Sequence, residues 1–171
     1  MLNPVQDGTL THVATFTPNA IVGLAQQRKD TFESNRHRVY AIAYWMTGNE
    51  MAAEDLMVDT FRAAFAESAS PTAEEVDLAL VAELRETFDI PVFTLDITVC
   101  TGIRNVRNNV LRTDLEIAVF ALPATEKLIF LLHDLEGYDH AYVAPLLGIT
   151  ERESRLGLHQ GRLRLRELLA K

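Results

Sequence analysis

The chain contains three Thr-x-x-Glu pairs, which begin at Thr72, Thr113 and Thr150. In such a pair the threonine hydroxyl accepts a hydrogen bond from the backbone N–H three residues on, and the glutamate carboxylate reaches back to the threonine N–H. The pattern marks the N-terminus of a helix, and apolar residues at intervals of three and four follow each pair. The chain is therefore predicted to be all-α.

The first half of the chain has the pattern of a helical hairpin. Apolar residues at helical spacing predict helices over residues 32–46 and 50–66. Gly48 can take the left-handed conformation after the first helix, and Asn49 can cap the second. Upstream, Thr17 is predicted to cap a separate short helix.

The periodicity changes after Pro91. Apolar and polar residues alternate over residues 93–99, which predicts a short extended segment in an otherwise helical chain. Helical spacing returns over residues 103–112, so Thr113 alone is expected to separate this helix from the next. The two halves of the chain are thus expected to be joined by a very short linker.

The C-terminal part has the pattern of a helix-turn-helix. Asp139 can cap a short helix that ends before Gly148, and Thr150 can cap the final helix. On that final helix five residues fall within about 80° of one another at the usual helical repeat, and we call them the basic stripe: Arg152, Arg155, His159, Arg162 and Arg166. A separate stripe is predicted to pack inward, and it consists of Ser154, Leu158, Gly161, Leu165 and Leu168. The simpler alternative is a surface helix whose arginines favour the negative end of the helix dipole.

Charge is unevenly distributed along the chain. The formal net charge of −8 argues against nonspecific nucleic-acid binding by the whole surface, because phosphates are neutralised by concentrated Lys and Arg. Residues 67–96 hold eight acidic side chains against Arg85 alone, a local charge of −7, whereas residues 150–171 have a charge of +3. The C-terminal end is therefore the candidate for contact with a polyanion.

Composition excludes several other classes of function. Hydrophobic residues make up 48% of the 171, which is ample for a core. The single cysteine, Cys100, can form neither an internal disulfide nor a multi-cysteine metal site, which agrees with a cytoplasmic protein. No apolar run approaches the roughly 20 residues of a membrane span. Since metal-ligand spacings, phosphate-binding loops and nucleophile elbows are absent from the sequence, no metal, cofactor or enzymatic activity is predicted.

Residues 38–65 and 121–150 contain two blocks of short motifs in order, and these blocks resemble the extracytoplasmic-function sigma factors, which direct bacterial RNA polymerase to promoters. Residues 38–49, 53–56 and 59–65 are similar to region two of that family. The resemblance implies that the second helix docks on the RNA polymerase core, with four residues facing the polymerase: Glu54, Asp55, Asp59 and Arg62. It also implies that Leu56 and Phe61 are packing residues.

Residues 121–150 resemble region four, which grips the minus-thirty-five promoter element. On this resemblance Arg155, Arg162 and Arg166 match basic positions that face DNA. Ser154 departs from the family pattern, because a buried aliphatic residue is usual there. The acidic residues 67–96 stand where the family has a basic and aromatic stretch for the minus-ten element, and their charge opposes a phosphate backbone.

The sequence predicts a sigma-factor-like transcription regulator that binds RNA polymerase core and promoter DNA. It would have two lobes, residues 28–112 and 113–171, after an N-terminal extension over residues 1–27. The main alternative is a sigma mimic that binds an anti-sigma factor or polymerase without initiating, which the short linker and acidic segment favour. A third alternative is a dimeric helix-turn-helix regulator that acts without polymerase.

Overall fold

The computed structural model describes residues 18–90, 106 and 109–170. All regular structure within these residues is helical, which confirms the all-α prediction. The elements are α1 (Pro18–Thr47), α2 (Glu50–Glu67), α3 (Ala73–Thr87), α4 (Arg112–Phe120), α5 (Ala124–Phe130), the π-helical turn η1 (Leu131–Leu135), α6 (His140–Leu147) and α7 (Glu151–Leu169). The extended segment predicted over residues 93–99 lies outside the described residues.

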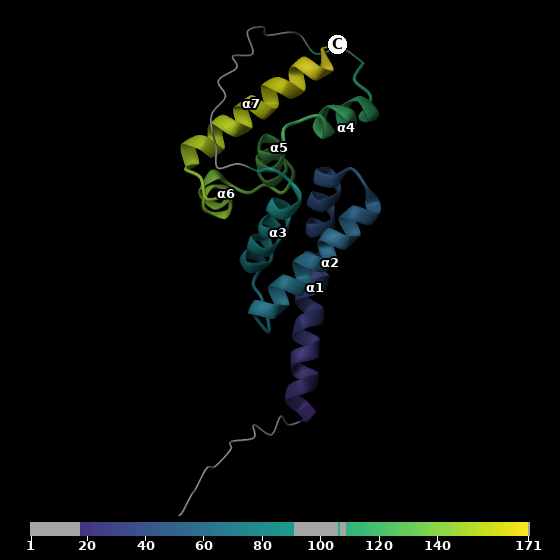
Figure 1. Ribbon diagram of the computed structural model, residues 1–171, viewed down its shortest axis with the longest axis vertical. Coiled ribbons are helices and arrows are strands. Elements are labelled where there is room, and N and C mark those ends of the chain that lie inside the picture. The colour runs from purple at the N-terminus through teal and green to yellow at the C-terminus, as the bar shows by residue number, and fades with distance from the viewer. Residues whose placement is uncertain (1–17, 91–105, 107–108, 171) are drawn as a thin grey trace, which may run out of the picture.

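α1 is one helix of 30 residues where the sequence predicted two. The predicted break near residue 30 contains neither glycine nor proline, so the backbone can continue through it. The side chains of Ser34 and Asn35 donate to the carbonyls of Asp30 and Thr31, four residues earlier in each case. Figure 1 shows the first half of α1 projecting beyond the other helices.

The predicted hairpin of α1 and α2 is confirmed. Gly48 has a φ of 67°, in the left-handed region that favours glycine. The Asn49 side chain accepts a hydrogen bond of 3.0 Å from the backbone N–H of Ala52 and so caps α2. These two adjacent residues reverse the chain.

Two of the three predicted capping boxes are confirmed, those at Thr72 and Thr150. The box predicted at Thr113 is wrong, because α4 begins at Arg112, two residues before the start that a cap at Thr113 would give it. Glu116 is engaged by the Arg112 guanidinium at 2.9 Å, and the Leu111 backbone N–H donates instead to Asp114 at 3.1 Å. A helical ion pair four residues apart therefore replaces the expected contact with Thr113.

The connection between α3 and α4 is longer than the sequence predicted. α3 ends at Thr87 and α4 begins at Arg112. The helix expected over residues 103–112 is wrong at residues 109–111, which form a turn and irregular backbone. The expectation that Thr113 alone separates two helices is therefore wrong as well, since residues 88–111 lie between α3 and α4.

The strongly apolar residues 125–136 contain a change of helix type. α5 passes into the π-helical turn η1, where the Glu136 backbone N–H reaches the Leu131 carbonyl at 3.0 Å. Such turns are uncommon and often occur at functional sites. Here the turn carries His133 and Asp134, which lie against α6 and α7.

One apolar core is built from residues of both halves of the chain. We call α1–α3 the N-terminal group and α4–α7, with η1, the C-terminal group. The same buried cluster contains Ile42 of α1, Leu84 of α3, Leu128 of α5 and Val143 of α6. α1 contacts α4, α5 and η1, and α3 contacts α6, as Figure 1 also shows for α3 and α6. The two groups thus pack directly against each other.

Candidate DNA-binding face and its neighbours

The last two helices form the predicted helix-turn-helix. Asp139 caps α6, because its carboxylate accepts a hydrogen bond of 2.8 Å from the Tyr142 backbone N–H. Gly148 follows α6 with a φ of 64°, a conformation in which other side chains are strained. Thr150 then begins α7 through its capping box. The short turn holds α7 against α6.

α7 buries one face and exposes the basic stripe. All five stripe residues are exposed, so the arginines point outward as predicted. The buried face consists of Ser154, Gly157, Leu158, Gly161, Leu165 and Leu169. Leu169 therefore completes this face in place of Leu168, which is half-buried. A Cβ added to Gly161 would lie 3.4 Å from the Glu126 carbonyl oxygen, so glycine permits the close approach of α7 to α5.

Two arginines of the basic stripe already have carboxylate partners. Arg155 lies 2.6 Å from Glu151, one helical turn earlier. Arg162 donates to both oxygens of Asp134, from Nε at 2.9 Å and from Nη2 at 2.5 Å. Burial alone would raise the pKa of the Asp134 carboxyl, but hydrogen bonds from Arg162 and His133 bring it below its ordinary value.

The other two arginines of the stripe, Arg152 and Arg166, have no ion pair with any residue that the structure describes. Both are exposed. A guanidinium without a carboxylate partner can meet a phosphate without first giving up a contact. Carboxylates therefore offset part of the positive charge of the basic stripe. The arginines without such a partner among the described residues are Arg152 and Arg166, at its two ends.

Beneath the basic stripe, two histidines link η1 and α6 to α7. The rings of His133 and His140 lie 4.4 Å apart between centroids. His140 Nδ1 is 2.9 Å from the hydroxyl of Ser154, which is fully buried. His133 in turn contacts Asp134 at 3.0 Å. The departure of Ser154 from the family pattern thus has a physical reason, because a buried hydroxyl needs a hydrogen-bond partner and His140 supplies one.

We expect stability to fall as the solution is acidified through the titration of His140. Burial lowers the pKa of His140, and the positive charges of His133, Arg155 and Arg162 lower it further. The unfolded chain takes up this proton near pH 6.5, so the stabilisation is complete above that pH and is lost as the pH falls through the lower folded-state pKa. Urea unfolding between about pH 7.5 and about pH 5.5 measures this loss.

The matched variants are His140→Asn and His159→Asn, since His159 is exposed on the basic stripe. The free energy of unfolding of the His140 variant should depend less on pH than that of the unaltered chain. The His159 variant should keep the original dependence. An equal pH dependence in the unaltered chain and the His140 variant would contradict this assignment.

α2 exposes the face for which the sequence predicted a partner. Glu54, Asp55 and Arg62 are exposed, whereas Asp59 is half-buried and lies 2.5 Å from Arg62. The expected packing residues, Leu56 and Phe61, are buried. Sequence reasoning missed two exposed apolar residues on this helix, Met51 and Val58. Met51, Asp55, Val58 and Arg62 recur at intervals of four, three and four, the spacing of a helix that pairs with another helix.

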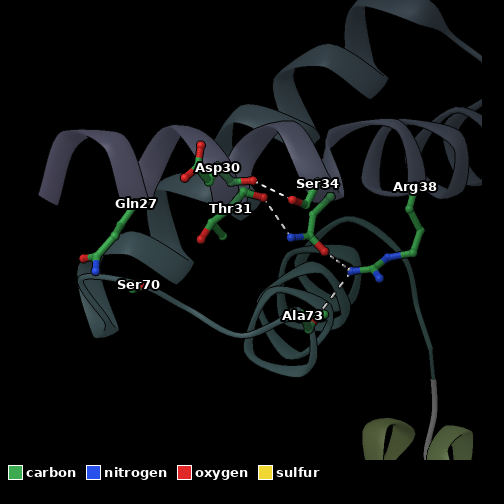
Figure 2. A pocket seen from close by; sticks show the side chains of 8 residues that line it. Gln27, Asp30, Thr31, Ser34, Arg38, Ser70 and Ala73 are labelled. Atoms are coloured by element: carbon green, nitrogen blue, oxygen red, sulfur yellow. Dashed lines mark hydrogen bonds between the residues drawn. The ribbon is translucent and has the colours of Figure 1, made fainter. Parts of the chain in front are cut away.

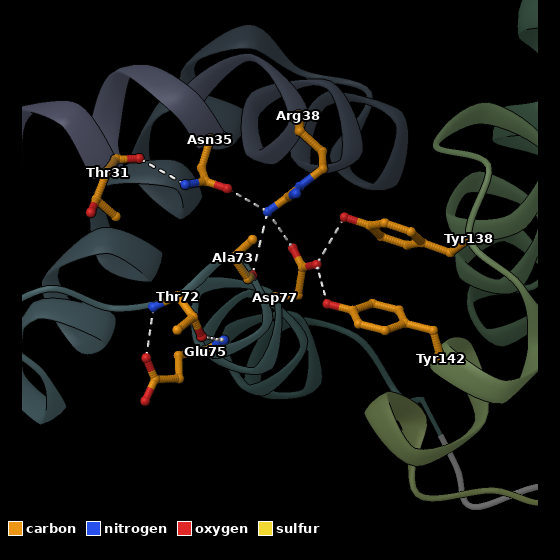
Figure 3. A network of polar contacts seen from close by, with 9 residues as sticks. All are labelled: Thr31, Asn35, Arg38, Thr72, Ala73, Glu75, Asp77, Tyr138 and Tyr142. Atoms are coloured by element: carbon orange, nitrogen blue, oxygen red, sulfur yellow. Dashed lines mark hydrogen bonds and ion pairs between the residues drawn. The ribbon is translucent and has the colours of Figure 1, made fainter.

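A buried polar network joins the two helix groups (Figure 3). Asp77 of α3 is only 1% exposed, and one of its carboxylate oxygens lies 2.8 Å from Arg38 of α1. The hydroxyls of Tyr138 and Tyr142 donate to the other oxygen at 3.0 and 2.9 Å. Asn35 orients Arg38 by accepting a hydrogen bond of 2.8 Å. We call Arg38, Asp77, Tyr138 and Tyr142 the Asp77 network.

Burial raises the pKa of Asp77, while the charge of Arg38 and the hydrogen bonds from the two tyrosines act against that rise. Burial and the nearby carboxylate raise the pKa of Tyr138 to about 12. The phenols therefore remain protonated donors to Asp77. The sequence held one signal for this network, because Asp77 falls on the same helical face as Leu80 and Leu84, where an apolar residue is expected.

A polar groove of about 550 Å³ lies beside α1 (Figure 2). Its wall includes Asn35, whose amide donates to the Thr31 carbonyl at 2.8 Å and whose oxygen accepts from Arg38. Arg38 also approaches the Ala73 carbonyl at 3.5 Å. These polar groups form hydrogen bonds with one another and with Arg38, so the wall of the groove holds the Arg38 side chain in position.

The described residues contain neither a metal-binding cluster nor a membrane-spanning helix. No group of three or more His, Cys, Asp or Glu side chains in that part of the chain is placed to hold a metal ion. Within the same residues, no helix is both long enough and apolar enough to cross a membrane.

Part of the C-terminal group is similar to a known family. Residues 118–165 match the family described as sigma-70, region 4. No curated protein matches the chain. Among solved structures, the chain is similar to the sigma factor RpoE of Bartonella quintana, crystallised in complex with the anti-sigma factor NepR. The TM-score is 0.55 at 20% identity, and the match covers 90% of this chain and 98% of that one.

The matched segment begins near the end of α4, contains all of α5, η1 and α6, and ends within α7, so it covers most of the helix-turn-helix. The structural likeness extends over the helices of both groups and, at this low identity, is a likeness of fold. Both findings support the resemblance to sigma factors: residues 118–165 are similar to sigma-70 region 4, in a chain whose fold is similar to that of a sigma factor.

Proposed function

We propose that this protein is a sigma-factor-like transcription regulator that binds the RNA polymerase core through α2 and promoter DNA through α7. The observation that carries the proposal is the coincidence of the region 4 match with a helix-turn-helix whose second helix exposes the basic stripe. A helix of this kind can enter a major groove, where arginine binds phosphates and guanine edges. It acts by binding, without a cofactor, in the cytoplasm.

The DNA contacts in this proposal come from the basic stripe. Arg152 and Arg166 lie at the two ends of the exposed face and have no carboxylate partner among the described residues, and Arg155, His159 and Arg162 lie between them. The buried face of α7 is held by Leu158, Leu165 and the close approach at Gly161. The helix can therefore meet DNA without disturbing its packing.

The polymerase contact comes from the exposed face of α2, with Glu54, Asp55, Asp59 and Arg62. Replacing Asp55 by Lys should lower affinity for purified RNA polymerase core by about tenfold or more, because it reverses a charge at the centre of a docking helix. Asp55 is exposed and the helix is packed through Leu56 and Phe61, so the fold should be retained. A binding titration with labelled protein and core enzyme measures the change.

Glu74→Lys is the matched control, since it makes the same charge reversal at an exposed position of α3. Its affinity for the core enzyme should stay close to that of the unaltered chain. The proposal fails if the unaltered protein does not bind the core enzyme. The role of α2 fails if Asp55→Lys binds as tightly as the unaltered chain.

The closed packing of the two helix groups supports a second candidate, a sigma mimic. A protein that remains closed would present a sigma-like surface to an anti-sigma factor and would not start transcription. The sigma factor of similar fold was crystallised with an anti-sigma factor. The short linker no longer supports this candidate, because residues 88–111 separate α3 from α4. Co-purification of an anti-sigma factor, without promoter-directed initiation, would favour the mimic.

A further inference from the structure

Two histidines lie together beneath the basic stripe, and we call them the histidine pair. The rings of His133, on η1, and His140, on α6, are 4.4 Å apart between centroids and inclined at 32° to each other. Both residues are half-buried. A positive charge on one ring therefore opposes a second positive charge on the other at short range.

The charges around the histidine pair nearly balance in the free protein. The charged groups that face it are Asp134 on η1 and Glu151, Arg155 and Arg162 on α7. Each carboxylate among them is paired with one of the two guanidinium groups. On α3, Asp77 and Arg85 contact α6 further along, at Tyr142 and Leu147. His140 is also the first residue of α6, where the positive end of the helix dipole disfavours a charged ring.

The contact between His140 and α7 is compatible with either charge state of the ring. His140 Nδ1 lies 2.9 Å from the hydroxyl of Ser154, which is fully buried in the face that α7 packs inward. A serine hydroxyl can donate to a neutral imidazole nitrogen and can accept from a protonated one. Proton uptake therefore reverses the direction of this hydrogen bond without breaking it. The histidine pair can gain a charge while α7 keeps its place.

We propose that the histidine pair couples proton uptake to DNA binding by α7, so that the protein binds DNA more tightly at mildly acidic pH. This inference rests on the proposed function, because the phosphates of bound DNA supply the negative charge that it requires. In the free protein, burial and the positive charges of His133, Arg155 and Arg162 lower the pKa of His140. Phosphates that contact the basic stripe oppose these positive charges, so the pKa of His140 should rise in the complex.

The sign of the effect follows from the direction of these two shifts. A group whose pKa is higher in the complex contributes affinity that is complete below its pKa in the free protein, and this contribution is lost as the pH rises through its pKa in the complex. The pKa of His140 in the free protein lies below the ordinary value of 6.5. DNA affinity should therefore increase several-fold between about pH 7.5 and about pH 5.5, since each unit of pKa rise corresponds to about tenfold in affinity.

Calorimetric titration of the full chain with a short DNA duplex of mixed sequence, at low salt, measures the coupling directly. Binding enthalpies at about pH 6, in two buffers of different ionisation enthalpy, give the number of protons taken up for each duplex bound. Uptake of a substantial fraction of one proton is expected for the unaltered chain. NMR titration of the histidine ring signals should show a higher pKa of His140 in the complex than in the free protein, and this measurement requires no substitution.

The control must separate the histidine pair from His159, which is exposed on the basic stripe and can itself gain a proton beside a phosphate. Proton uptake should persist in His159→Asn and should fall sharply when His140→Asn is added to it. Helical circular dichroism at the same pH tests that each variant is folded.

The possible outcomes separate this coupling from the proposed function. DNA binding without proton uptake, or with an uptake that His159→Asn alone abolishes, would overturn the coupling and leave the proposed function in place. An unchanged pKa of His140 in the DNA complex would overturn the coupling in the same way. Absence of DNA binding by the folded, unaltered chain at low salt would overturn the DNA-binding part of the proposed function, and the coupling with it.

Discussion

Replacing Leu128 by Ala should lower the free energy of unfolding by about 2–5 kcal/mol. Leu128 is fully buried in the core cluster that contains residues of both helix groups. Truncation removes apolar contacts and leaves a cavity that close-packed neighbours fill only in part. Because the cluster is shared, the loss should weaken the packing of α1 and α3 as well as that of α5.

Urea unfolding followed by two signals tests this expectation. Helical circular dichroism reports the whole chain, and the fluorescence of Trp45, the single tryptophan, reports the contact with Phe120 between the groups. The two transitions should coincide and shift together in Leu128→Ala, as expected for one cooperative unit. Leu78→Ala, at a half-exposed position of α3, should change stability by no more than about 0.5 kcal/mol. Separate transitions in the unaltered chain would contradict a shared core.

Removing Arg152 and Arg166 together should weaken DNA binding more than removing Arg155 and Arg162. The first two have no ion pair in the described part of the chain, whereas the second two are held by Glu151 and Asp134. An arginine that binds a phosphate releases about one counterion, so loss of two such contacts should reduce the slope of log affinity against log salt by about 2. Affinity at low salt should fall by roughly tenfold for each lost contact.

A variant that should increase DNA affinity complements the variants that should lower it. Asp134→Asn removes the charge that holds Arg162 by two hydrogen bonds, and the freed guanidinium should increase both DNA affinity and the salt slope. Anisotropy titrations of a labelled duplex at several salt concentrations provide all these values. An unchanged salt slope in Arg152→Ala with Arg166→Ala would show that the basic stripe does not contact phosphates.

Local signals in the sequence predicted much of the fold. The boxes at Thr72 and Thr150 and the reversal at Gly48 depend on residues within one turn, so their chemistry can be read from neighbours alone. The outward direction of the basic stripe follows from the helical repeat and the apolar residues around it. The capping box predicted at Thr113 was wrong because Glu116 forms an ion pair with Arg112 instead, which spacing alone does not reveal.

Features that depend on tertiary packing could not be predicted from the sequence pattern. The shared core and the Asp77 network join residues that are about 60 positions apart, such as Asp77 and Tyr138, and no periodicity links them. The π-helical turn carries His133 and Asp134, whose partners His140 and Arg162 lie on other helices and cannot be found from local propensity. Asp77 on an apolar helix face and Ser154 on another were the visible signs, since buried polar residues require partners.

The central claim is that this chain directs RNA polymerase to promoters, and in vitro transcription tests it most directly. Purified core enzyme, the full-length protein and a set of fragments from the genome of origin are combined, and start sites are mapped. Initiation from a defined group of promoters is expected, and it should be lost with Arg152→Ala and Arg166→Ala. Binding of the core enzyme without initiation on any fragment would contradict it.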